Sequence, residues 1–219
     1  MPRFCANLTM LFNEVDFLDR FEKAAQAGFK GVEYLFPYAW KKEQLAEKLA
    51  AHGLVQVLHN LPAGDWNAGE RGIACLPGRE AEFQEGVGRA TEYARALKCP
   101  QINCLAGLTP RNAPADEVRQ TLLANLRFAA AALAKHGIRL LVEALNDKDV
   151  PGFHLVRTAD VLALIQEVGH PNVFVQYDVY HMQIMEGNLT QTIRSNLGKV
   201  AHIQIADNPG RTEPGTGEL

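Results

Sequence analysis

Residues 138–181, IRLLVEALNDKDVPGFHLVRTADVLALIQEVGHPNVFVQYDVYH, contain the pattern that decides the fold. The β-like runs at 138–146 and 172–181 are apolar on both faces, and the helical run between them, at 158–169, ends in a glycine. Strands that are apolar on both faces are typical of a parallel sheet covered by helices, in which each helix connects two neighbouring strands. The stretch therefore predicts a β-α-β unit.

The same alternation extends along the whole 219-residue chain. Seven β-like runs alternate with helical ones such as residues 15–28 and 115–137, in which apolar residues recur at helical spacing. No GxGxxG follows the first strand, and this disfavours a dinucleotide-binding open sheet. We expect an α/β protein with a (β/α)8 TIM barrel in a single domain, residues 1–219, from which the eighth βα unit is missing.

Composition and charge exclude several classes of protein. A net charge of −3 gives no reason to expect a nucleic-acid partner, and no apolar run approaches the roughly 18 residues that a membrane span requires. The N-terminal MPRFCANL lacks the features of a signal peptide, so a cytoplasmic location is the expectation. The four scattered cysteines are expected to be free thiols.

A long polar segment, residues 62–80, separates the third β-like run from the next helix. Loops of this length in compact domains are usually functional or disordered. Arg71 and Arg79 lie in it, and either could bind a substrate carboxylate, because a guanidinium binds planar anions with two hydrogen bonds. Both could equally be solvated loop charges.

Polar residues at the predicted carboxyl ends of strands are the candidates for chemistry, because parallel α/β folds place their active sites there. They are Asn7, Glu33, His59, Asn103, Glu143, Asp178, His181, His202 and Gln204. Glu143 and Asp178 end strongly apolar strands, and together with the Gln204 oxygen they would suit Mg²⁺ or Mn²⁺. The alternative is that each acid is a satisfied structural group. His59 and His202 could be core residues, and His181 either faces a ligand from the loop after its strand or lies on the surface.

Four separated segments resemble the hydroxypyruvate isomerase family, within the xylose-isomerase-like barrels. They are LHNLPAGDWNAGERGIACLPGR (58–79), LLVEALN (140–146), VQYDVYHMQ (175–183) and HIQIADNPGRTEPGTGE (202–218). The resemblance implies a metal-dependent barrel that interconverts hydroxypyruvate and 2-hydroxy-3-oxopropanoate. The family's metal ligands are a glutamate, an aspartate, a glutamine and a second glutamate, and the first three correspond to Glu143, Asp178 and Gln204.

The resemblance also implies that the two glutamates act as proton donor and acceptor. Glu143 would be one of them, but the second belongs to the eighth strand, and no residue of this sequence matches it. The substrate would be a small anionic hydroxy-oxo acid, with Arg71 receiving its carboxylate and His181 polarising one of its oxygens. Because barrels commonly pair, a homo-oligomer is also expected.

Other readings stay open at this point. A 2-oxo-tetronate isomerase or a sugar epimerase could use the same barrel with a roomier pocket, whereas an endonuclease would need more histidine ligands and a basic surface. A non-catalytic binding module is a further alternative, because no residue of this sequence matches the family's second glutamate. If the chain natively ends at Leu219, we expect an unclosed edge between the first and seventh strands, with poor stability and weak isomerase activity.

Overall fold

The computed structural model describes residues 2–219. Its strands are β1 (Cys5–Asn7), β2 (Gly31–Glu33), β3 (Val55–Asn60), β4 (Gln101–Cys104), β5 (Arg139–Glu143), β6 (Val173–Asp178) and β7 (Val200–Gln204). Its helices are a 3-10 turn η1 (Phe17–Asp19), α1 (Arg20–Gln26), α2 (Lys42–Ala51), α3 (Glu80–Leu97), α4 (Ala115–Ala134), α5 (Thr158–Val168), α6 (Val179–Met185) and α7 (Leu189–Asn196). Within residues 2–219, no helix combines the length and apolar character needed to cross a bilayer.

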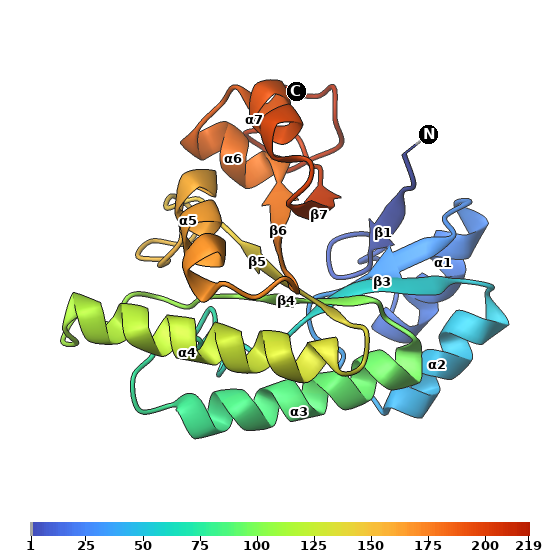
Figure 1. Ribbon diagram of the computed structural model, residues 1–219. Coiled ribbons are helices and arrows are strands. Elements are labelled where there is room, and N and C mark those ends of the chain that lie inside the picture. Colours follow the sequence, from blue (N-terminus) through green and yellow to red (C-terminus); the bar gives the residue numbers. More distant parts are fainter. Residues whose placement is uncertain (1) are drawn as a thin grey trace.

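The strands form a single curled sheet in which every neighbouring pair is parallel and the spatial order follows the sequence, from β1 to β7. Figure 1 shows the sheet curling so that β1 and β7 approach each other, while α3 and α4 lie along its outer side. The prediction of a TIM barrel with seven of its eight strands is therefore confirmed for the described part of the chain.

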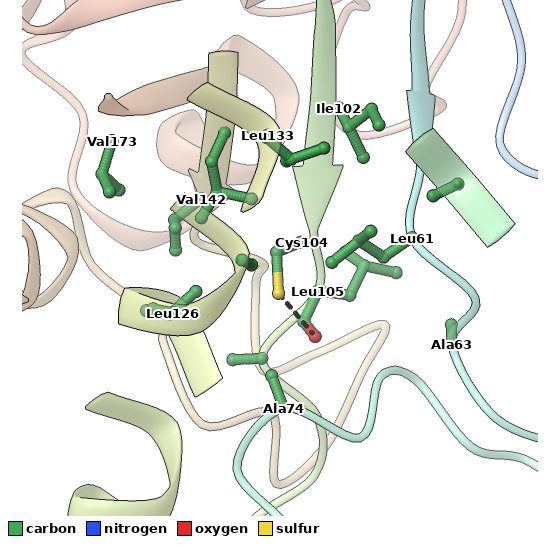
Figure 2. Packing of buried hydrophobic residues seen from close by; sticks show 14 of the residues in the cluster. Leu61, Ala63, Ala74, Ile102, Cys104, Leu105, Leu126, Leu133, Val142 and Val173 are labelled. Carbon is green, nitrogen blue, oxygen red and sulfur yellow. Dashed lines mark hydrogen bonds between the residues drawn. The ribbon is translucent and has the colours of Figure 1, made fainter. Parts of the chain in front are cut away.

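Helix α4 packs against the middle of the sheet and buries apolar side chains there. Figure 2 shows Leu126 and Leu133 of α4 beside Ile102 and Cys104 of β4 and Val142 of β5, and all five are buried. Fully burying a leucine of this kind stabilises the fold by about 1.5–3 kcal/mol, so this layer gives the strand ends a rigid support. All four cysteines are free, as predicted.

The long loop between β3 and α3 is packed against the end of β4. The backbone N–H of Cys75 donates to the carbonyl of Ala106 at 2.8 Å. Gly72 has a φ of +115°, and a Cβ at this position would lie 2.2 Å from the carbonyl oxygen of Leu105. Only glycine fits such a close approach, so the loop is fixed at the carboxyl edge of the sheet.

The chain after Asp178 differs from its predicted structure. Residues 172–181 were expected to continue as a strand and then a loop, but β6 ends at Asp178 and α6 begins at Val179. The carboxylate of Asp178 accepts the backbone N–H of Tyr180 at 2.9 Å and so caps the new helix. An aspartate placed directly after an apolar strand is thus both a strand terminator and a helix start.

Candidate active site

Two carboxylates meet at the carboxyl edge of the sheet. Glu143 is the last residue of β5 and Asp178 is the last residue of β6, the neighbouring strand. Together with His181, they form a group whose potential ligand atoms lie within 4.8 Å of one another. Helices cover the outer face of the sheet, so these polar groups come together where the strands end.

The environment of Glu143 is buried and favours the protonated form of its carboxyl group. Its side chain is buried, and Asn103 on β4 donates its amide to the Glu143 Oε2 at 2.9 Å. Burial and the nearby charge of Asp178 raise the pKa of Glu143 to about 8, against the opposing hydrogen bonds from Gln176 and Asn103. A carboxyl group with a pKa near neutrality can both accept and return a proton at physiological pH.

Asp178 has one cationic partner. Its pKa is raised by burial, although the Arg211 guanidinium and the backbone N–H groups at the start of α6 act in the opposite direction. Arg211 donates to Asp178 Oδ2 at 3.1 Å, and its guanidinium lies over the ring of Tyr180 at 4.7 Å from the ring centre. A guanidinium has five N–H donors, so Arg211 retains donors for a further anion.

His181 lies in the site, but on a helix rather than in the expected loop. It is the third residue of α6 and is almost completely buried, which corrects both the loop placement and the surface alternative. Its Nδ1 accepts the backbone N–H of Asn146 at 3.2 Å, and its Nε2 lies 3.3 Å from Arg211 Nη2 and 3.6 Å from Asp178 Oδ2. Burial and the charge of Arg211 lower its pKa to about 3, so the imidazole is neutral.

Gln204 is the last residue of β7 and pairs in register with Asp178. Its amide nitrogen donates to Glu33 Oε1 on β2 at 2.6 Å, and its amide oxygen accepts from Gln176 Nε2 at 2.9 Å. Because β2 and β7 are not neighbours in the sheet, this bond joins the two sides of the curled sheet by side chains. Gln204 therefore lies between the candidate acids and a second buried glutamate.

Glu33 is the centre of that second group. The contact between His202 Nε2 and Glu33 Oε2 is 2.6 Å, and Asn7 Nδ2 donates to Oε1 at 3.0 Å. Burial would raise the pKa of Glu33, but hydrogen bonding and charge from His202, with further hydrogen bonds from Gln204 and Cys5, lower it instead. His202 thus contacts the buried Glu33 carboxylate and is not an isolated core residue.

The two arginines of the long loop lie among loop partners. Arg71 donates to the backbone carbonyls of Trp66 and Glu70 and lies 4.1 Å from the centre of the Trp66 ring. Arg79 pairs with Glu70 and Glu82. The structure therefore brings Arg211, and not Arg71, into contact with the candidate carboxylates.

Arg211 was not among the candidates from the sequence, and an aspartate fixes the loop that carries it. Asp207 is fully buried, and its carboxylate accepts five backbone N–H groups, those of Asn208, Gly215, Thr216, Gly217 and Leu219. Burial opposes the charge, but these donors lower the pKa of Asp207 to about 2. The only available signal in the sequence was an aspartate followed by a loop with several glycines.

The donor set suits a hard divalent cation. Glu143 and Asp178 offer carboxylate oxygens and Gln204 offers an amide oxygen, which are the ligand types that Mg²⁺ and Mn²⁺ prefer. The Gln204 oxygen and the Glu143 carboxylate both accept from the side chain of Gln176, so they face the same amide group. A cation would also relieve the repulsion that raises the pKa of the two buried acids.

Comparisons with known proteins identify the family of the chain. The family described as "Xylose isomerase-like TIM barrel" matches residues 21–219. Hydroxypyruvate isomerase of Escherichia coli is 58% identical over 219 residues, which cover all of this chain and 85% of the relative. 2-oxo-tetronate isomerase of Cupriavidus necator is 49% identical, with coverage of 100% and 84%.

Among solved structures, a crystal structure of "AP endonuclease, family 2" from Brucella melitensis superposes with a TM-score of 0.98 at 48% identity, covering 100% of this chain and 84% of that one. The curated relatives at 58% and 49% identity are named as isomerases of small sugar acids. The chain is therefore a sugar-acid isomerase with a small-molecule substrate, and it belongs to the xylose isomerase-like TIM barrel family.

Proposed function

We propose that this protein interconverts hydroxypyruvate and 2-hydroxy-3-oxopropanoate with the help of a divalent metal, Mg²⁺ or Mn²⁺. The observation that carries the proposal is the meeting of two buried carboxylates, Glu143 and Asp178, at the ends of neighbouring barrel strands, with Gln204 paired in register with Asp178. The 58% identity to a hydroxypyruvate isomerase over the whole chain favours this substrate over the four-carbon alternative.

The reaction moves a carbonyl between adjacent carbons and needs a positioned acid–base group. Glu143 takes the proton from the hydroxyl-bearing carbon, which leaves an enediolate. A proton returned to the neighbouring carbon, together with transfer of the hydroxyl proton to the former carbonyl oxygen, completes the isomerisation. A divalent metal held by Glu143, Asp178 and Gln204 would supply Lewis-acid stabilisation of the negative charge on the substrate oxygens.

Arg211 and His181 bind and orient the anionic substrate in this proposal. The neutral His181 polarises a substrate oxygen, and the spare donors of Arg211 bind the carboxylate. Arg71 remains the second candidate for that role, since the long loop that carries it lies at the same edge of the sheet. Both arginines are on loops, so the position of the loop sets the length of substrate whose carboxylate each guanidinium can reach.

The test is an isomerase assay on the purified protein with hydroxypyruvate and with a 2-oxo-tetronate, followed by NMR before and after EDTA treatment and readdition of Mn²⁺ or Mg²⁺. We expect turnover of hydroxypyruvate that EDTA abolishes and the metal restores, with a lower kcat/KM for the four-carbon acid, because an extra carbon must be fitted. Preference for the longer acid would assign the activity to 2-oxo-tetronate. Metal binding without turnover of either acid would favour a binding module.

A further inference from the structure

Glu33 is a buried carboxylate near the candidate site with several side-chain partners, and the proposed function does not use it. Asn7 and Gln204 donate to its Oε1 at 3.0 and 2.6 Å. On Oε2, Cys5 Sγ donates at 3.4 Å and His202 Nε2 lies at 2.6 Å. These partners come from β1 and β7, so Glu33 on β2 gathers side chains from both sides of the curled sheet.

This arrangement leaves Glu33 no capacity to bind a metal. A carboxylate has about four positions at which it can accept; Asn7, Gln204 and Cys5 donate to Glu33, and His202 Nε2 lies 2.6 Å from its Oε2. Cys5, Glu33 and His202 do lie within the distances that one ion could bridge. Their polar atoms point at the Glu33 oxygens, however, so the group satisfies a buried charge rather than offering lone pairs to a cation.

The remaining consequence concerns the direction of the Gln204 amide. A glutamine side chain has an oxygen end and a nitrogen end of almost the same shape, and only the oxygen can bind a cation. The Glu33 oxygen accepts from the Gln204 nitrogen, which turns the amide oxygen toward Gln176 on β6, on the side of the candidate acids.

We infer that Glu33 is a positioning residue that fixes the Gln204 amide with its oxygen toward the metal site. The inference rests on the proposed function, because it requires that Gln204 helps to hold a metal. Partners that orient a metal ligand typically change metal affinity by about 10–100-fold when they are replaced. Glu33 acts on the metal only through Gln204.

The test measures Mn²⁺ binding by calorimetry on the purified protein and on variants whose folding is checked by circular dichroism. Glu33→Gln removes the charge that selects the nitrogen end of Gln204, and we expect Mn²⁺ affinity to fall about 10–100-fold. Glu33→Asp keeps the charge but withdraws the carboxylate by one methylene, and we expect a smaller loss; it provides the test if Glu33→Gln does not fold. The matched control is Cys5→Ala, which removes a Glu33 partner without touching Gln204 and should leave the affinity within about twofold.

A double variant separates positioning from general structural support. In Glu33→Gln/Gln204→Glu the amide and the carboxylate exchange places, so an amide nitrogen on β2 can donate to a carboxylate on β7 that still offers an oxygen. We expect the double variant to bind Mn²⁺ more tightly than either single variant. Undiminished Mn²⁺ binding by both Glu33→Gln and Glu33→Asp, or no recovery in the double variant, would overturn the inference alone. Absence of Mn²⁺ binding by the unmodified protein would overturn the proposed function, and the inference with it.

Discussion

Glu33 and Glu143 occupy equivalent positions, yet their environments have opposite effects. Each is the last residue of a barrel strand, and their exposed fractions are nearly equal, 3% and 4%. Donors from β1 and β7 surround Glu33 and lower its pKa, whereas burial and the charge of Asp178 raise the pKa of Glu143 to about 8. Equal burial is thus accompanied by a lowered pKa in one place and a raised pKa in the other.

The two glutamates differ in the number of hydrogen-bond donors around the carboxylate. This number indicates which buried acid can bind a proton or a cation. Asp207 resembles Glu33, since five backbone N–H groups hold its charge. Glu143 and Asp178 have fewer donors and repel each other, an arrangement that costs stability and is typical of functional sites. Buried acids with a full set of donors therefore support the fold, and those without are free to bind a cation or a proton.

The largest expected effect comes from neutralising Glu143, the buried acid with few hydrogen-bond donors. Glu143→Gln removes the proton-transfer group, so kcat for hydroxypyruvate should fall by about 10²–10⁴-fold. The variant should nevertheless be at least as stable as the unmodified protein in EDTA at pH 8.5, because the amide cannot repel Asp178. Steady-state kinetics and urea unfolding measure the two quantities. An active variant, or one that is inactive because it is unfolded, would contradict the comparison.

A second pair of variants distinguishes the two arginines. Arg211→Met removes the guanidinium that contacts Asp178, and Arg71→Met removes the one that stacks on Trp66. Hydrogen bonds to charged groups contribute about 1.5–3 kcal/mol, so losing the carboxylate receptor should raise KM by roughly 10–100-fold. We expect this for Arg211→Met and a change of less than about threefold for Arg71→Met. The reverse order would return the role to Arg71.

Asp207, the buried acid with five N–H donors in the loop 207–219, gives a third test. Asp207→Asn places an NH₂ or a neutral oxygen where five N–H groups converge, so the loop should open and trypsin should cut after Arg211 more than about tenfold faster. Mass spectrometry of timed digests locates and measures the cut.

Two glycines extend this test. Gly217→Ala should have the same effect, because its Cβ would lie 2.0 Å from the Asn208 carbonyl oxygen. Gly198→Ala is the control, since a Cβ there meets nothing within 4 Å. Resistance of both Asp207→Asn and Gly217→Ala to trypsin would show that the loop is held by other contacts.

The architecture and the strand-end candidates were predictable because each depends on local patterns. The alternation of apolar strands and amphipathic helices identified the barrel, and Glu143, Asp178 and Gln204 each end a strand as expected. Parallel pairing brings the carboxyl ends of the strands to the same edge of the sheet, whatever the conformation of the loops. Strand-end polar residues could therefore be selected without knowledge of any contact.

The other features of the site depend on contacts between distant parts of the sequence. The bond between Arg211 and Asp178 joins residues 33 positions apart, and the bond between Glu33 and Gln204 joins residues 171 positions apart. A loop such as 207–219 has no periodicity from which its shape could be predicted, so Arg211 was missed. His181 was misplaced because no local pattern indicated that Asp178 would cap a short helix.

The smallest expected effect concerns His59, a buried histidine in which only one of the two ring nitrogens has a hydrogen-bond partner among the described residues. Its side chain is fully buried; Nδ1 lies 3.1 Å from the carbonyl oxygen of Asn60, and Nε2 has no partner among the described residues. Burial penalises the imidazolium and lowers the pKa to about 4, below the 6.5 of a free histidine. The folded protein therefore keeps His59 neutral in a range where the unfolded chain takes up a proton.

This proton uptake sets the sign of the pH dependence. The contribution of His59 to stability is fully present above pH 6.5 and is lost as the pH falls from 6.5 toward 4, by about 1 kcal/mol between pH 7.5 and 5.5. His59→Gln cannot titrate, so urea unfolding at these two pH values should show a smaller loss for the variant by that amount. His154 and His181, whose pKa values are also lowered, contribute equally to both proteins and cancel in the difference. Parallel pH profiles would show that the folded protein accommodates a charged His59, and that buried groups other than acids do not follow the rule that separates Glu33 from Glu143.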